Sequence, residues 1–283
     1  MLSREKGPIG IFDSGYGGLT IFDEIRRVMP DYDYIYMGDN ARTPYGTRSF
    51  EVVYHFTRQA VMRLFEEGCQ LVVLACNTAS AKALRTIQTD DLPDWDASRR
   101  VLGVIRPTVE ILDDLSVTKH IGVLGTSGTI SSRSYELEVA KMFPHITIVG
   151  QACPMWVPLV ENNEFAAPGA DYFVKKYLDE ILDKDPLIDT LILACTHYPL
   201  LFDKIRRHVP ANVGLFSQGE RVAASLKEYL LRHPEMDAKL TKTLTKTKKH
   251  RFLTTESAEK FSEAASIFLS CNIDVEQISM KSS

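Results

Sequence analysis

The segment Leu71-Val72-Val73-Leu74-Ala75-Cys76-Asn77-Thr78 decides how this sequence is interpreted. A run of β-favouring apolar residues leads directly into a thiol, an amide and a hydroxyl. An uninterrupted apolar run of this kind is typical of a strand that is buried on both faces, as in parallel sheets covered by helices. Ligands of open α/β sheets bind just beyond the carboxyl ends of such strands. The sequence therefore places Cys76 at a sheet edge where a functional site is expected.

Nearly the same pattern occurs again as Leu191-Ile192-Leu193-Ala194-Cys195-Thr196-His197. A buried free cysteine is usually only a small hydrophobic residue, but two cysteines at equivalent strand ends, each followed by polar groups, favour a functional role. A second pair of similar segments, Ile9-Gly10-Ile11-Phe12-Asp13-Ser14-Gly15 and Ile121-Gly122-Val123-Leu124-Gly125-Thr126-Ser127-Gly128, is separated by a similar length of chain. Both pairs indicate that one α/β unit is used twice.

Composition and charge restrict the class of protein. The chain has 283 residues, of which 45% are hydrophobic and 25% charged, as in a globular protein of one large or two medium domains. Its net charge of −4 gives no general attraction to nucleic acid or to anionic membranes. The first six residues lack the apolar core of a signal peptide, and no apolar run approaches membrane-spanning length. We expect a protein without membrane or nucleic-acid partners.

The cysteines argue against a scaffold role. There are 5 of them, an odd number, and no two form a Cys-x-x-Cys pair. That pattern does not fit a disulfide framework or a structural zinc site. We therefore expect a reducing, cytoplasmic setting and no bound metal.

Predicted strands and helices alternate along the chain, which is typical of mainly parallel sheets. The expected strands are 8–13, 34–37, 71–74, 101–105, 121–124, 146–150, 191–194 and 213–216. The expected helices are 19–29, 49–67 with Ser49 as its cap and Gly68 at its end, a helix ending near 88, 130–142, 168–182, a helix ending at 208, 219–231 and 255–269. Residues 89–100 read as a surface connection, and 151–161 is broken by prolines.

These elements predict an α/β fold of two similar domains, related by a pseudo-twofold duplication, with the active site in the cleft between them. The first domain would comprise residues 1–103 and 211–283, and the second residues 104–210. The strand at 213–216 would lie in the first domain. The chain would cross between the domains twice, and the two crossovers would form a hinge.

The segment 239–251 carries several lysines and an arginine. A nucleic-acid patch is one interpretation, and a solvated, threonine-rich loop or hairpin is the other. The acidic balance of the whole chain favours the loop.

Four motifs in order along the chain resemble those of the glutamate racemase family. They are Asp13-Ser14-Gly15-x-Gly17-Gly18-Leu19, Gly38-Asp39-x-Ala41-Arg42-x-Pro44-Tyr45-Gly46, Ala75-Cys76-Asn77-Thr78 and Cys195-Thr196-His197-Tyr198-Pro199-Leu200-Leu201. The resemblance runs from about residue 8 to 270. It implies cofactor-independent interconversion of L- and D-glutamate, which supplies D-glutamate for peptidoglycan, by a homodimer.

The sequence also departs from the usual pattern of that family. Arg106-Pro107-Thr108 stands where the family commonly has Glu-Pro-Gly, and the turn Ser217-Gln218-Gly219-Glu220 differs from its familiar version. Neither departure includes a cysteine. We expect any consequence to fall on the hinge, on the contact between subunits or on regulation.

Racemisation removes a proton from one face of Cα and returns a proton to the other, so two opposed acid–base groups suit it. A free thiol has a pKa of roughly 8.5 and needs activation by a neighbour or a helix N-terminus. The resemblance implies that Asp13 assists Cys76, and that His197, with Glu161 nearby, assists Cys195. Taken singly, His197 could be a structural histidine, Asp13 a turn residue and Glu161 a helix cap.

The resemblance also implies the substrate contacts. Hydroxyl, amide and backbone groups at the strand ends would bind the carboxylates of glutamate; they belong to Asp13, Ser14, Tyr45, Gly46, Asn77, Thr78, Thr129, Thr196 and His197. Each of these residues could instead serve a turn or a cap. No lysine occupies a matching motif as a Schiff-base candidate, so we expect no pyridoxal phosphate and no other cofactor.

Three alternatives compete with this interpretation. A related aspartate or hydantoin racemase would share the paired cysteines, but Thr196-His197-Tyr198-Pro199 favours the glutamate form. A non-catalytic amino-acid sensor would explain the polar strand ends and leave the doubled cysteine without a purpose. A thiol-redox enzyme would need a resolving cysteine pair, and none is evident.

Overall fold

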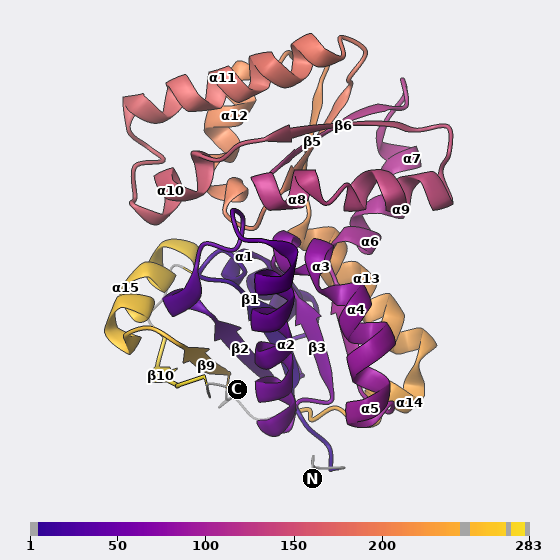
Figure 1. Ribbon diagram of the computed structural model, residues 1–283, viewed down its shortest axis with the longest axis vertical. Coiled ribbons are helices and arrows are strands. Elements are labelled where there is room, and N and C mark those ends of the chain that lie inside the picture. Colours follow the sequence, from indigo (N-terminus) through magenta and orange to yellow (C-terminus); the bar gives the residue numbers. More distant parts are fainter. Residues whose placement is uncertain (1–4, 244–249, 270–272, 281–283) are drawn as a thin grey trace.

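The computed structural model describes residues 5–243, 250–269 and 273–280, and it contains two parallel sheets, one above the other in Figure 1. The first sheet has the order β10-β9-β2-β1-β3-β4 and the second has the order β6-β5-β7-β8. The strands of the first are β1 (Ile9–Asp13), β2 (Tyr34–Gly38), β3 (Leu71–Leu74), β4 (Arg100–Gly103), β9 (Arg251–Thr254) and β10 (Val275–Gln277). Those of the second are β5 (His120–Gly125), β6 (Thr147–Ala152), β7 (Thr190–Ala194) and β8 (Gly214–Ser217). The predicted α/β class is confirmed.

The strand order supports the predicted duplication. Within the first sheet the run β2-β1-β3-β4 matches β6-β5-β7-β8, with the first strand of each unit between the second and the third. Gly10 on β1 is paired with Val72, and Gly122 on β5 is paired with Leu191. A Cβ atom at Gly10 would lie 3.1 Å from the Val72 side chain, and one at Gly122 would lie 2.5 Å from that of Leu191. The two central strands therefore meet the cysteine-bearing strands in the same way.

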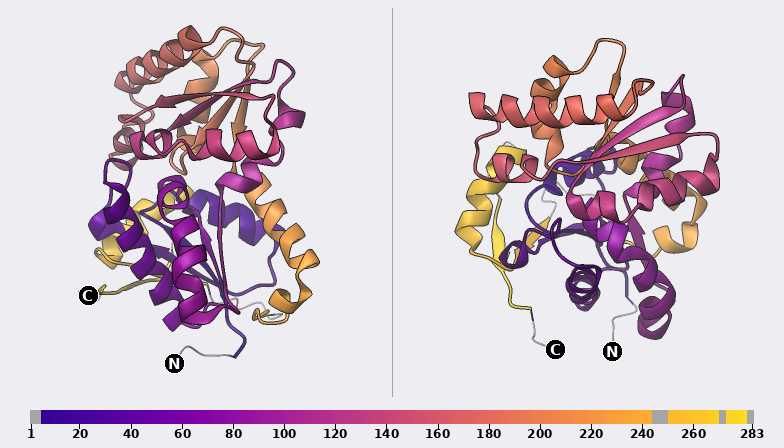
Figure 2. Two further views of the ribbon diagram at one scale, coloured as in Figure 1. Left: turned by 45° about the vertical axis from the view of Figure 1, so that its right-hand side comes forward. Right: turned by 45° about the horizontal axis from the view of Figure 1, so that its top comes forward.

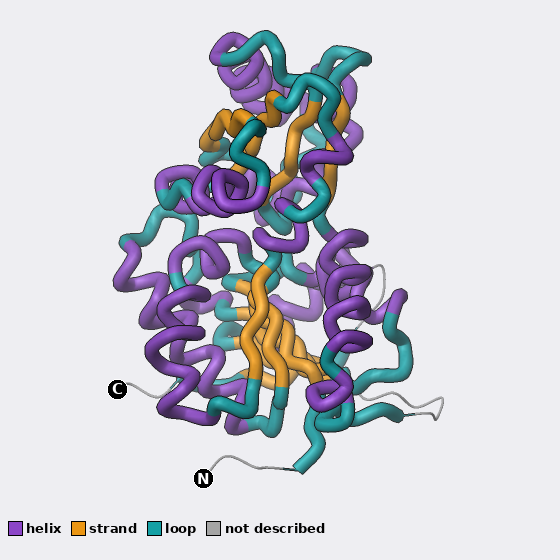
Figure 3. Tube along the Cα trace, turned by 90° about the vertical axis from the view of Figure 1, so that its right-hand side faces the viewer, coloured by secondary structure: helices purple, strands orange, loops and turns teal. Residues whose placement is uncertain are grey.

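Helices cover both faces of the first sheet, as Figure 3 shows. On one face α1 (Leu19–Val28), α13 (Gly219–Arg232) and α15 (Ala258–Leu269) share a core with β1 and β2. On the other face α2 (Phe50–Glu66) packs over β3. The expected cap of α2 is confirmed, because the Ser49 hydroxyl accepts a hydrogen bond from the amide of Val52, and Gly68 has φ +95° just beyond its end.

The second sheet also lies between helices, and the left-hand view of Figure 2 shows it apart from the first sheet. One face is covered by α10 (Trp156–Glu161), α11 (Pro168–Lys184) and α12 (Phe202–His208). The other face is covered by α6 (Ile105–Val109) and α9 (Ser134–Met142), with α7 (Leu112–Leu115) and α8 (Ser127–Ser131) beside them. The core below α10 and α11 is built around Trp156, whose ring meets that of Tyr198 at a centroid distance of 4.8 Å.

The structure corrects three expectations. Strand β8 pairs with β7, so residues 214–217 belong to the second sheet, whereas the sequence-based division placed 211–283 in the first domain. The expected surface connection at 89–100 is largely helical. After α3 (Asn77–Lys82), α4 (Leu84–Thr86) leads through a π-helical turn (Ile87–Asp91) into α5 (Leu92–Asp96). Pro93 is accommodated because it lies in the first turn of α5.

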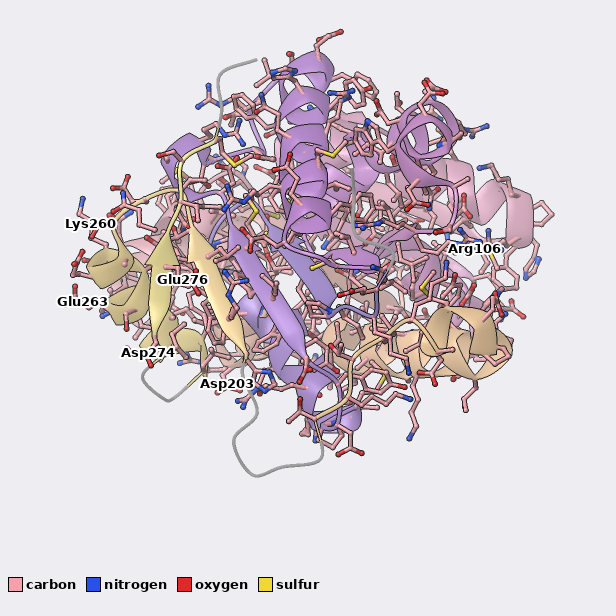
Figure 4. The ribbon with its side chains drawn as sticks, turned by 90° about the horizontal axis from the view of Figure 1, so that it is seen from below. Arg106, Asp203, Lys260, Glu263, Asp274 and Glu276 are labelled. Atoms are coloured by element: carbon pink, nitrogen blue, oxygen red, sulfur yellow. The ribbon has the colours of Figure 1, made fainter. Side chains whose placement is uncertain are left out.

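The third correction concerns the end of the chain, where β9 and β10 extend the first sheet and neither strand was predicted. Arg251 on β9 forms an ion pair of 2.8 Å with Glu276 on β10. Figure 4 shows Glu276 and the exposed Lys260 and Glu263 of α15 on the side of the molecule opposite Arg106. The basic segment lies partly outside the described residues; its described part contributes Leu240 and Lys242 to short bridges with Gly7 and Tyr32.

The chain passes between the sheets twice, as expected, first from β4 through α6 and α7 to β5, and again from β8 through Gln218 to α13. Short elements complete the described chain, namely η1 (Asn40–Arg42), η3 (Tyr198–Leu201) and α14 (Pro234–Asp237). No helix among the described residues is both long and apolar enough to cross a membrane.

Candidate active site

The loops that follow the strands of one sheet contact the loops that follow the strands of the other. The amide of Gly128, after β5, donates to the carbonyl of Gly46, after β2, at 2.7 Å. Thr196 Oγ1, after β7, donates to Asp13 Oδ2, at the end of β1, at 3.3 Å. The carboxyl ends of the two sheets therefore face each other. Cys76 and Cys195, which follow β3 and β7, are both buried at this junction.

Gly17 allows the closest approach of the two sets of loops. A Cβ atom at this position would lie 2.4 Å from Thr196 Oγ1 and 2.5 Å from His197 Nδ1. Both distances are shorter than atoms of a real side chain can reach. Only glycine fits here, so the glycine-rich turn after β1 serves to bring the two halves of the site together.

The Cys76 sulfur is held by hydrogen bonds at the start of α3. It lies 3.5 Å from Ser14 Oγ, and it accepts a hydrogen bond of 3.4 Å from the backbone amide of Ala79. Burial and, to a smaller extent, the negative charge of Asp13 raise the pKa of this thiol to about 12, although the contacts with Ser14 and Ala79 oppose the shift. Cys76 is therefore a neutral thiol at neutral pH in the free protein.

The Cys195 sulfur faces a histidine. His197 Nδ1 lies 3.8 Å from the sulfur, and His197 Nε2 lies 3.1 Å from Glu161 Oε1 on α10. Burial lowers the pKa of His197, but the contacts with Cys195 and Glu161 outweigh burial and raise the pKa to about 10. The ring is therefore a cation at neutral pH, and this cation faces the Cys195 sulfur.

Asp13 lies between the two sulfur environments and is completely buried. Its Oδ1 accepts a hydrogen bond of 2.9 Å from the amide of Gly15. Burial raises the pKa of this carboxyl, and the charge of His197 and the hydrogen bonds of Gly15, Gly18 and Thr196 oppose that shift. The hydroxyl in contact with the Cys76 sulfur belongs to Ser14, so Asp13 acts on Cys76 through its charge.

Three threonine hydroxyls form a cluster where the two halves meet. Thr78 Oγ1 lies 2.9 Å from Thr126 Oγ1 and 3.3 Å from Thr129 Oγ1, and the last two are 3.1 Å apart. Each hydroxyl can donate one hydrogen bond, so the cluster can turn its donors toward an anion. Thr78 and Thr129 were predicted as substrate contacts; Thr126 was missed, although Thr126 begins a helix after a strand just as the predicted residues do.

Two other predicted contacts have their side chains engaged elsewhere. The Tyr45 hydroxyl donates to the buried Asp39, which also accepts from Arg42 Nε at 2.7 Å. The Asn77 amide bonds Gln218 and Tyr135. Gly46, another predicted contact, lies at the junction of the two halves, where its carbonyl accepts the hydrogen bond of Gly128. Gln218 and Tyr135 were not anticipated, because they are far from the motifs in sequence.

Among the described residues, no group of three or more His, Cys, Asp or Glu side chains is placed to hold a metal ion. The junction of the two halves contains several groups that can exchange or donate protons, namely the sulfur atoms of Cys76 and Cys195, the His197 ring with Glu161, the Asp13 carboxyl and the cluster of threonine hydroxyls. Such a set can move protons at two separate positions.

Comparisons with known proteins agree with this arrangement. The family model described as Asp/Glu/Hydantoin racemase matches residues 20–218. A glutamate racemase of Ruegeria sp. (strain TM1040) is 40% identical over 81% of this chain and 87% of its own. The structure of a glutamate racemase isoform from Bacillus anthracis has a TM-score of 0.88 and 36% identity over 97% of this chain and 98% of that chain.

A further solved structure, a glutamate racemase from Francisella tularensis in complex with D-glutamate, has a TM-score of 0.84 and 31% identity over 97% of this chain and 98% of that chain. The predicted resemblance is therefore confirmed across both sheets. The chain belongs to the Asp/Glu/Hydantoin racemase family and is an amino-acid racemase.

Proposed function

We propose that this protein interconverts L- and D-glutamate by two-base proton transfer at Cα, with Cys76 and Cys195 as the two bases and no cofactor. The observation that carries the proposal is the pair of cysteines at equivalent strand ends of two facing halves, each with a different partner for its sulfur. The relatives named above as glutamate racemases support glutamate as the substrate.

The charges at the junction suit a pair made of one thiolate and one thiol. We assign the thiolate to Cys195, because the His197 ring lies 3.8 Å from its sulfur, and the thiol to Cys76, whose pKa is raised to about 12. In this state Cys195 takes the Cα proton of L-glutamate from one face, and Cys76 delivers its own proton to the opposite face. D-glutamate leaves, and the enzyme then carries a Cys195 thiol and a Cys76 thiolate.

The reverse direction needs the Cys76 thiolate. Burial makes the pKa of Asp13 higher than that of an ordinary carboxyl, so Asp13 is a better proton acceptor than an exposed aspartate. We assign Asp13 to the deprotonation of Cys76 and His197, held by Glu161, to Cys195. Each assistant then belongs to one face of the substrate, as the sequence motifs predict.

Recognition of the substrate carboxylates is assigned to the hydroxyl cluster and the strand-end amides. Thr78 and Thr129 supply hydroxyl donors on one side, and the Ser14 hydroxyl and the backbone of Thr196 supply donors on the other, because the Thr196 hydroxyl donates to Asp13. Hydrogen bonds from such donors to a charged carboxylate are stronger than those between neutral groups. We infer that Asn77 and Tyr45 contribute through their backbone or through neighbouring residues, because their side chains bond within the protein.

We also propose that the two sheets with their helices form two domains of an enzyme that works in the cytoplasm as a homodimer and supplies D-glutamate for peptidoglycan. The family resemblance supports these assignments. Light scattering of the purified protein measures the number of subunits, and a mass of 31.9 kDa for the particle would contradict the homodimer.

The experiment that tests the reaction uses protein dialysed free of cofactors and metals, incubated with either enantiomer in deuterated water. We expect loss of optical rotation, and in early samples deuterium at Cα of the product with hydrogen retained in the remaining substrate, because the abstracting thiol returns the substrate's own proton. Equal early deuterium in both pools would contradict the two-base mechanism. Racemisation of aspartate in place of glutamate would contradict the substrate, and no turnover would favour a sensor.

A further inference from the structure

The two stretches in which this sequence departs from the family's usual pattern meet in the structure. Gln218 lies in the second crossover, as the residue before α13, and its Nε2 donates to Thr108 Oγ1 of α6, in the first crossover, at 2.7 Å. The bond therefore joins the two crossovers directly.

Gln218 also closes a ring of hydrogen bonds with two further side chains. Gln218 Nε2 donates to the Tyr135 hydroxyl at 2.8 Å, and that hydroxyl donates to Asn77 Oδ1 at 2.7 Å. Asn77 Nδ2 then donates to Gln218 Oε1 at 2.7 Å. All three bonds run in one direction around the ring, which is the arrangement in which hydrogen bonds strengthen one another.

The ring is buried and its members are satisfied. Asn77, Thr108, Tyr135 and Gln218 are each no more than 3% exposed. Both N–H groups and the oxygen of Gln218 have hydrogen-bond partners. The Thr108 hydroxyl in turn donates a hydrogen bond of 2.9 Å to the carbonyl of Val104. A fully satisfied buried network specifies one arrangement of the parts that it joins.

The parts joined here are both crossovers, α9 of the second half, and α3 of the first. Asn77 is the first residue of α3 and directly follows Cys76, whose sulfur caps that helix through the amide of Ala79. A shift of Asn77 would therefore turn the helix start and move the sulfur. The rest of the ring belongs to elements outside α3, so it sets Cys76 relative to the second half.

We propose that Gln218 is a positioning residue, which holds Cys76 in place for proton transfer through the ring that it forms with Asn77 and Tyr135 and through its bond to Thr108. This inference rests on the proposed function, because it assigns to the ring an effect on one of the two proton transfers. Misplacement of a reacting group by about 1 Å can lower a rate by about a hundredfold.

The test measures kcat and the isotope effect of α-deuterated D- and L-glutamate for Gln218→Leu, Thr108→Val and Thr108→Ser. We expect Gln218→Leu to lower kcat by about tenfold to a hundredfold, Thr108→Val to lower it less, and Thr108→Ser to keep it. The double variant Thr108→Val/Gln218→Leu should lose no more than Gln218→Leu alone. Glu220→Gln, two residues further along and exposed, is the control that leaves kcat unchanged.

The isotope effects separate positioning from mere loss of folded protein. Cys76 abstracts from D-glutamate in the proposed mechanism, so a slower Cys76 step should raise the effect for deuterated D-glutamate and reduce that for deuterated L-glutamate. A purely structural role would lower kcat and leave both effects at their wild-type values, which would overturn the inference.

Wild-type kcat in both Gln218→Leu and Thr108→Val would also overturn it. If Gln218→Leu does not fold, the Thr108→Val and Thr108→Ser pair decides between the two outcomes by the same isotope effects. Failure of the proposed function is distinguishable from failure of the inference, because it shows as a wild-type protein that does not racemise glutamate.

Discussion

The strands that carry Cys76 and Cys195 occupy the same place in their sheets, but the groups that face the two sulfur atoms differ in charge. Burial and the negative charge of Asp13 raise the pKa of the Cys76 thiol and keep it protonated, against the opposing hydrogen bonds of the Ser14 hydroxyl and the Ala79 amide. Cys195 lies beside a histidinium that is held by Glu161. The duplicated scaffold places both sulfur atoms at the junction of the two halves, and the groups beside them differ: a carboxyl near Cys76 and a histidinium near Cys195.

This difference in neighbouring charge suits the two-base reaction that we propose. Two identical thiolates would leave no proton to deliver, and two identical thiols would leave no base. Since the equilibrium constant between enantiomers is one, kcat/KM must be the same in the two directions whatever the environment of each sulfur. The asymmetry must therefore appear in kcat and KM taken separately and in isotope effects.

The largest expected effect comes from removing either sulfur. Cys76→Ala and Cys195→Ala should each lower kcat by about 10⁴-fold or more, because one face loses its proton donor and acceptor. Each should cost only about 1–2 kcal/mol of unfolding free energy for the small cavity. Cys69→Ala is the matched control, since that thiol is buried in the core of the first sheet and should lose stability with activity retained. Near wild-type racemisation in either active-site variant would rule out the two-base assignment.

The next largest effects are expected from Asp13 and His197, which we assign to the proton transfers of Cys76 and Cys195 respectively. Asp13→Asn and His197→Asn should lower kcat by about 10²–10⁴-fold and change KM less, because both are assigned to proton transfer. With α-deuterated substrates, we expect the isotope effect to rise for D-glutamate in Asp13→Asn and for L-glutamate in His197→Asn. If both variants changed only KM, these residues would bind the substrate and the assignment of one to each side would be wrong.

A smaller effect is expected at the cluster of threonine hydroxyls, to which both halves contribute and which we assign to substrate binding. Thr129→Val keeps the shape of the side chain and removes one donor from the hydroxyl cluster. A hydrogen bond to a charged group contributes about 1.5–3 kcal/mol, so KM should rise by about tenfold or more with kcat less changed. Ser131→Ala, in the same short helix, serves as the control. An unchanged KM for glutamate would show that the cluster does not contact the substrate.

The smallest expected effect concerns how the free energy of unfolding depends on pH when the contact between Glu161 and His197 is removed. The pKa of His197 is raised from 6.5 to about 10, so its contacts contribute stability that is fully present below pH 6.5 and lost as pH rises toward 10. Glu161→Gln removes one of those contacts. Its unfolding free energy should fall below that of the wild type most at pH 6 and least near pH 10, and kcat should fall only severalfold.

Urea unfolding of the wild type, Glu161→Gln and the exposed control Glu164→Gln at several pH values measures this difference. A gap between the wild type and Glu161→Gln that widened toward pH 10 would contradict a protonated His197. A gap equal to that of Glu164→Gln would show that Glu161 does not support the histidine.

The sequence was informative where a pattern is local. The apolar runs that end at Cys76 and Cys195 predicted β3 and β7, because a buried parallel strand needs no alternation. The strand 213–216 was also recognised, but its sheet was not, since pairing with β7 depends on how the chain returns and not on its own residues. Asp90, Asp91 and Pro93 resembled a turn, yet the proline fits the first turn of α5.

For the site, too, local patterns were predicted correctly and contacts between distant segments were not. The motif residues predicted that His197 lies near Cys195 and that Asp13 lies at the site, because each lies at a strand end or at most three residues beyond one. The hydrogen bond between Asn77 and Gln218 spans 141 residues, and no spacing or composition marks such a pair. What sequence patterns miss here are the contacts made only when distant segments are brought together.

The strand order of the first sheet has a consequence for synthesis of the chain. All strands of the second sheet lie between residues 120 and 217, whereas the first sheet takes its central strands from the first 103 residues and its edge from β9 and β10. The face of the first sheet that α13 and α15 cover stays open until those helices leave the ribosome. The half that carries Cys195 can thus be complete while the half that carries Cys76 still exposes part of its hydrophobic core. A chain that terminated prematurely would then have one folded half and one half prone to aggregation.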